Sequence, residues 1–171
     1  MRTALGFLSI GILACLSLCQ EQPMPAQPPL LRKAFTVELQ VEDKKQPYIE
    51  HFENVPFVAD NSVYLFPGDD FGVDLTVTIG KVVTVVYDPR PKKADVEFTF
   101  TQLRAANNKR PFMILGVENR LARVVAFNAV LTLPEKKKDH ETHIFKIQKG
   151  ENRMYSWPSP TVKVALVDFR F

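Results

Sequence analysis

Cysteine, glycine and histidine are scarce in this chain, and each shortage removes a class of functional site. The only two cysteines, Cys15 and Cys19, lie near the N-terminus. The residues after them therefore contain no disulfide, no cysteine nucleophile and no cysteine-based zinc site. With seven glycines in all, the sequence has neither a phosphate-binding glycine loop nor a Gly-x-Ser-x-Gly nucleophile elbow.

Long helical patterns and a strong charge of one sign are also lacking. No long segment repeats apolar residues at the i, i+3, i+4, i+7 spacing of an amphipathic helix, and only residues 102–107 and 118–123 are compatible with short helices. The formal net charge of +3 is small, whereas nucleic-acid-binding domains carry a strongly basic face. Nucleic acid is therefore not an expected partner.

The first residues have the order of an export signal. Arg2 is followed by a short apolar run that ends at Ala14-Cys15. The run is shorter than the about 20 apolar residues that a membrane-spanning helix needs. Ile12-Leu13-Ala14-Cys15 resembles a bacterial lipoprotein signal, and this resemblance implies cleavage before Cys15 and lipidation of that residue. The alternatives are an ordinary secretory signal, cut near Cys19 or Ala26, and a retained anchor.

Composition then divides the chain into three parts. Residues 1–14 are the expected signal peptide, and residues 15–33 form a proline-bearing tether that cannot build a core. Residues 34–171 have the usual length of one domain and are long enough for a substantial core. The resemblance of the signal places this domain on the periplasmic face of a bacterial membrane or on the cell surface, with secretion as the alternative.

Within residues 34–171, the apolar residues follow the period of two that is typical of strands. Val96, Phe98 and Phe100 alternate with polar residues, and similar runs recur between proline-, glycine- and asparagine-rich turns. Nine or ten short strands without helical layers predict an all-β antiparallel β-sandwich, with an immunoglobulin-like arrangement as the first choice. The shared spacing also predicts that the Phe98 side chain faces the core.

No metal ion or other cofactor is expected. His140 and His143 are three positions apart, which places them on opposite faces of a strand and one residue short of the His-Glu-x-x-His zinc motif. The acidic residues Asp60, Asp69, Asp70 and Asp74 do not have the spacing of a calcium loop. The turn-forming sequence Pro67-Gly68-Asp69-Asp70 predicts a hairpin turn instead.

Candidate binding residues are of two kinds, and both have an ordinary structural explanation as well. Basic clusters fall in predicted turns, where they either solvate loop tips or meet an acidic partner or anionic lipid. Tyr155 and Trp157 are residue types that are enriched at binding hot spots, but they are equally common in cores. The candidates are Arg90, Lys92, Lys93, Lys136, Lys137, Lys138, Tyr155 and Trp157.

The sequence as a whole favours an exported, lipid-anchored β-sandwich that acts by binding and not by catalysis. Its expected partner is another envelope protein or a polysaccharide, in addition to the membrane that holds the lipid. Two alternatives remain open. Val167, Phe169 and the final Phe171 alternate like the last strand of a small outer-membrane β-barrel, and unmarked loop carboxylates are compatible with an envelope hydrolase.

Overall fold

A computed structural model describes residues 28–42, 46–78, 81–104, 110–134 and 140–171. Strands dominate it, and they are joined by turns and one short 3-10 helix, η1 (Pro91–Lys93). The strands are β1 (Phe35–Leu39), β2 (Tyr48–Phe52), β3 (Val58–Ala59), β4 (Ser62–Leu65), β5 (Asp69–Thr78), β6 (Lys81–Asp88), β7 (Val96–Arg104), β8 (Pro111–Asn119), β9 (Val125–Thr132), β10 (His140–Ile147), β11 (Asn152–Trp157) and β12 (Lys163–Arg170).

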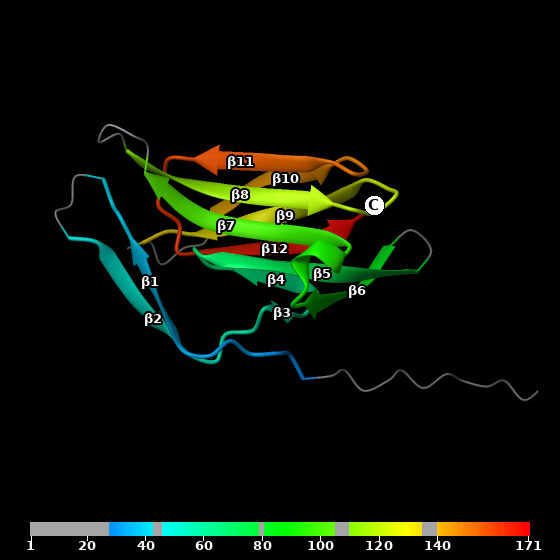
Figure 1. The fold of residues 1–171 in the computed structure, drawn as a ribbon, viewed down its shortest axis with the longest axis horizontal. Coiled ribbons are helices and arrows are strands. Elements are labelled where there is room, and N and C mark those ends of the chain that lie inside the picture. Colours follow the sequence, from blue (N-terminus) through cyan, green and yellow to red (C-terminus); the bar gives the residue numbers. More distant parts are fainter. Residues whose placement is uncertain (1–27, 43–45, 79–80, 105–109, 135–139) are drawn as a thin grey trace, which may run out of the picture.

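The strands form two antiparallel five-stranded sheets and a separate two-stranded hairpin. The first sheet has the order β6-β5-β7-β8-β11 and the second has the order β10-β9-β12-β4-β3. Among the described residues, β12 and β6 join the two sheets through one residue pair, Arg170 opposite Lys81. The two sheets lie face to face (Figure 1), so the predicted antiparallel β-sandwich is confirmed.

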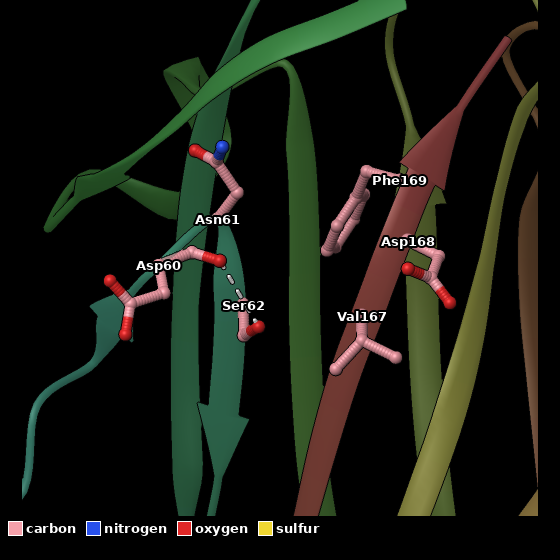
Figure 2. Close-up of a pocket in the computed structure, with 6 residues that line it drawn as sticks. All are labelled: Asp60, Asn61, Ser62, Val167, Asp168 and Phe169. Carbon is pink, nitrogen blue, oxygen red and sulfur yellow. Dashed lines mark hydrogen bonds between the residues drawn. The ribbon is translucent and has the colours of Figure 1, made fainter.

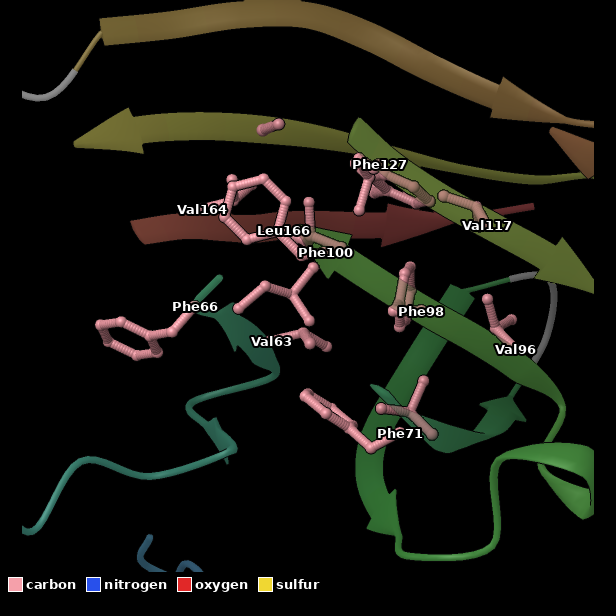
Figure 3. Close-up of a cluster of buried hydrophobic side chains, with 14 of the residues drawn as sticks. Val63, Phe66, Phe71, Val96, Phe98, Phe100, Val117, Phe127, Val164 and Leu166 are labelled. Atoms are coloured by element: carbon pink, nitrogen blue, oxygen red, sulfur yellow. The ribbon is translucent and has the colours of Figure 1, made fainter. Parts of the chain in front are cut away.

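Phenylalanine side chains from both sheets meet in the core between them (Figure 3). The prediction for Phe98 is confirmed: Val96, Phe98 and Phe100 on β7 all point inward, and Phe98 is completely buried. The Phe98 ring lies 5.9 Å from the Phe127 ring of the opposite sheet, measured between centroids, in an edge-to-face arrangement that aromatic pairs favour. Because the two inner faces are apolar along whole strands, the sandwich needs no covalent cross-link.

The β1–β2 hairpin packs across one end of the sandwich. Val37 and Leu39 are buried in the core, and the Phe52 ring lies 4.9 Å from the Phe66 ring. The Gln102 side chain of β7 accepts a hydrogen bond from the Gln40 backbone N–H (2.8 Å) and donates one to the Gln40 carbonyl (3.0 Å). The hairpin therefore covers the end at which β7 finishes.

Turn chemistry agrees with the sequence at the start of β5. Pro67 and Gly68 occupy the centre of a turn that the Asp69 N–H closes onto the Phe66 carbonyl at 2.9 Å. Gly68 has a φ of 100°, a value that a residue with a side chain rarely adopts. The chain does turn at residues 67–70, but the prediction of a hairpin turn is wrong: the turn joins β4 to β5, which lie in different sheets and do not pair, and Asp69 and Asp70 already belong to β5.

The two segments that the sequence allows as short helices, residues 102–107 and 118–123, are not helical in the parts that the structure describes. Gln102 and Leu103 continue β7, and β8 runs to Asn119. The buried Asn119 amide donates to the carbonyls of Arg123 (2.8 Å) and Gln148 (3.0 Å), while its oxygen accepts from Leu121 N–H (3.0 Å). This side chain organises residues 119–123 as an irregular connection. In the described residues, no helix is long and apolar enough to cross a membrane.

Candidate functional site

The basic residues after β6 lie in and beside η1, at the corner between β6 and β7. Arg90 clasps Asp88 with two side-chain hydrogen bonds of 2.9 and 3.0 Å, and these bonds lower the pKa of Asp88. Arg120, from the connection after β8, donates to the Pro91 carbonyl at 2.5 Å and pairs with Glu97. Arg90 is therefore occupied by an internal partner, whereas the neighbouring lysines, Lys92 and Lys93, are exposed.

The other predicted basic cluster, Lys136, Lys137 and Lys138, lies outside the described residues. The strands around it place its attachment points far from η1. The Asn119 side chain, opposite Val96 at the η1 end, contacts the Ile147 carbonyl at 3.3 Å, so β10 finishes at that end. Because β9 and β10 are antiparallel, β9 finishes and β10 begins at the opposite end, beside the β1–β2 hairpin (Figure 1).

Tyr155 and Trp157 point into the sandwich from β11. The Tyr155 ring meets Phe145 edge-on at 4.4 Å, and the Trp157 ring stacks on Phe100 at 5.9 Å. The Trp157 Nε1–H donates to the Thr161 hydroxyl at 2.8 Å. Both aromatic candidates thus take part in the packing between the sheets, and both are half-buried.

The structure does not describe the side chains of the other residues that the sequence analysis discussed, Cys15, His140 and His143. Cys15 lies outside the described residues. His140 and His143 belong to β10, which has a β-bulge between Thr142 and Ile144, but their side chains are not among those described. Across the part of the chain whose side chains are described, no group of three metal-ligating residues comes together.

One shallow pocket of about 240 Å³ lies between the β3–β4 turn and β12 (Figure 2). Asp60 and Asn61 form the two-residue turn with φ values of 49° and 56°, and Asp168 has a φ of 56° at a bulge in β12. The carboxylate of Asp60 turns away from that of Asp168, which accepts a hydrogen bond from Asn128 at 2.9 Å. The two carboxylates therefore do not form a general acid–base pair across this pocket.

An apolar patch lies on the outer face of the first sheet, beside the free edge of β11. Met154 is 74 % exposed and lies opposite Gly116, diagonal to Ile114 on β8. Two residues along β8, Phe112 lies opposite Leu103, which is 43 % exposed. We call these four residues, Leu103, Phe112, Ile114 and Met154, the outer-face patch.

The rest of this outer face is polar, as expected for the solvent side of an antiparallel sheet. Thr99 and Thr101 follow the patch along β7, and Glu97 and Glu118 lie beyond them. An added Cβ at Gly116 would come within 2.3 Å of the Thr99 hydroxyl oxygen, so the two strands are closely fitted there. The patch could not be predicted from the sequence, because the register between β11 and β8 decides on which face of the sheet Met154 lies.

Comparisons of the chain with protein-family models, curated proteins and solved structures found no match.

Proposed function

We propose that this protein is an exported, lipid-anchored envelope protein whose β-sandwich binds another envelope protein through the outer-face patch and catalyses no reaction. The observation that carries the proposal is the patch itself. The exposed Met154 and Leu103, with the half-buried Ile114 and Phe112 between them, form an apolar row on an otherwise polar sheet face, and such surfaces mark interaction sites. Its aliphatic and aromatic side chains favour a protein surface over a polysaccharide.

The position of the patch supports this proposal. Its outermost member, Met154, lies on β11, which forms a free edge of the first sheet. A partner that covers Met154 also reaches unpaired backbone groups along that edge, and such groups are suited to pairing with an added strand. Apolar contact and backbone hydrogen bonding are thus available side by side.

The proposed anchor is consistent with a domain that works close to a membrane. If Cys15 carries the lipid, residues 16–27 separate it from the first described residue. A fully extended chain of that length spans roughly 40 Å at about 3.3 Å per residue. The sandwich would therefore meet its partner within one or two domain diameters of the bilayer.

The test is substitution of the patch with a matched control. Met154→Asp and Leu103→Asp should abolish cross-linking of the protein to its envelope partner, because each places a charge in the contact. Ile49→Asp should have no effect, since Ile49 is 63 % exposed but lies on the β1–β2 hairpin. Equal cross-linking by all three variants, with unchanged melting temperatures, would contradict the proposal.

The hydrolase alternative has its own discriminating result. Its described candidates are the carboxylates at the shallow pocket, Asp60 and Asp168, which point apart (Figure 2). Turnover of an envelope substrate that disappears in an Asp60→Asn, Asp168→Asn double variant would favour the enzyme and overturn the proposed binding role.

A further inference from the structure

A short segment at the start of the described chain is bound to the sandwich like a peptide ligand. We call residues 28–33 the strap. Leu31 pairs with Pro56 in an isolated β-bridge, the Arg32 N–H donates to the Val55 carbonyl at 2.8 Å, and the Phe57 N–H donates to Leu30 at 3.2 Å. Every strap residue is exposed except Arg32, whose exposed fraction is 7 %. Arg32 is therefore the one strap side chain that is buried against the sandwich, in addition to these backbone contacts.

The Arg32 guanidinium enters a site that is built for its shape and charge. It donates to the Pro56 carbonyl at 2.5 Å, to the Tyr64 carbonyl at 2.6 Å and to the Asp69 carboxylate at 2.6 Å. These acceptors come from three separate places in the chain and converge on one planar group. Such a fork of donors is available in arginine and not in lysine.

Aromatic rings complete the site. The guanidinium carbon lies 4.0 Å from the centroid of the Phe57 ring, 5.1 Å from that of Phe66 and 5.7 Å from that of Phe71. Distances within about 6 Å favour cation–π attraction, which is stronger where water is excluded. The three rings and Asp69 thus form a cage for a planar cation.

Asp69 is held in place independently of the strap. Its carboxylate also accepts a hydrogen bond from the Phe66 N–H at 2.7 Å, within the turn that starts β5. Burial raises the pKa of Asp69, and the charge of Arg32 opposes that rise. The hydrogen bond from Phe66 does not involve Arg32, and it fixes the same carboxylate oxygen that the guanidinium contacts.

We infer that this cage is an arginine-recognition site for an extended peptide, and that the strap is its resident ligand. The site combines backbone pairing along residues 55–57 with one deep pocket for a guanidinium, which is a recurring mode of peptide recognition. An arginine on an extended segment of another chain presents the same groups, so it would compete with the strap. This inference does not depend on the outer-face patch.

The first test vacates the site in the full-length chain. Arg32→Ala should bind a fluorescent peptide of residues 28–33, and replacing the peptide's arginine with citrulline, a neutral isostere, should weaken binding at least tenfold. At a peptide concentration ten times Kd, the melting temperature should rise by about 3–6 °C. Equal binding of the arginine and citrulline peptides would overturn the inference.

The second test needs no vacant site and applies even if Arg32→Ala fails to fold. An arginine-specific protease should cut after Arg32 at least ten times faster in Asp69→Asn than in the wild type, because the strap is released more often. Cutting after Arg120 should stay slow, which separates strap release from unfolding. Asp70→Asn is the matched control, since Asp70 is exposed. Equal cutting after Arg32 in both variants would overturn the inference.

Discussion

Replacement of Phe98 by alanine should cause one of the largest losses of stability that a single substitution produces in this domain. The ring is fully buried between the sheets, 5.9 Å from Phe127 and 6.4 Å from Phe169 between ring centroids. Truncation of a buried phenylalanine removes its burial energy and leaves a cavity, at a cost of about 3–5 kcal/mol. Domains of this size lose about 2–4 °C in melting temperature per kcal/mol, so the expected drop is roughly 6–20 °C.

Urea unfolding followed by circular dichroism measures this loss directly, and the same strand offers a matched control. Leu103 lies on the opposite face of β7 and is 43 % exposed, so Leu103→Ala should cost no more than about 1 kcal/mol. If Phe98→Ala loses less than about 1 kcal/mol, or no more than Leu103→Ala, the assignment of the inner face of β7 is wrong.

Three further predictions concern the termini and charges of the chain. Mass spectrometry should find the native N-terminus lipidated at Cys15 and unmodified in Cys15→Ser; an unmodified wild-type chain that begins at Gln20 would exclude this. Hydrogen bonds from Arg90 lower the pKa of Asp88 in the folded state. The stability that the charged Asp88 contributes is therefore fully present above the pKa of an unfolded aspartate, about 3.9, and it is lost as the pH falls from there through the lowered pKa of the folded state. Asp88→Asn should therefore lose less stability than the wild type between pH 6 and pH 3, and equal losses would refute this linkage. Charge reversal at Lys92 and Lys93, and separately at Lys136 and Lys137, should leave partner binding unchanged at low and high salt, because the clusters solvate loop tips. A salt-dependent loss of binding for either pair would contradict this and would show that the pair attracts an acidic partner.

Regular alternation made the central strands predictable. Val96, Phe98 and Phe100 revealed both the strand and its inner face, because each polar neighbour between them points to solvent. The turn at Pro67-Gly68 was equally clear, since proline and glycine each satisfy one backbone requirement of that turn. Local patterns of this kind depend on neighbours within a few residues.

Strand β11 was not predicted, for a physical reason that its residues show. Arg153, Tyr155 and Trp157 share the inner face, and a charged residue at the start of that row conceals the alternation. The Arg153 guanidinium lies 5.5 Å from the Tyr155 ring centroid, at the open side between the sheets, so its charge is accommodated without full burial. That accommodation depends on tertiary structure.

The arginine site was missed because its parts are far apart in sequence. Arg32 falls within the segment 15–33 that the sequence predicts as a tether, and nothing beside it signals burial. Its partner Asp69 is 37 positions away, in a turn that explains an aspartate without any ion pair. The folded domain consequently includes residues 30–33, upstream of the boundary that composition places at residue 34.

Site-specific photo-cross-linking in intact cells tests the proposed binding role most directly. A photoreactive phenylalanine analogue at Met154 should give one discrete heavier product that contains an envelope protein. The same analogue at Ile49, a comparably exposed position on the β1–β2 hairpin, should give none. A discrete product at Ile49 together with none at Met154, or no product at either position, would contradict the account.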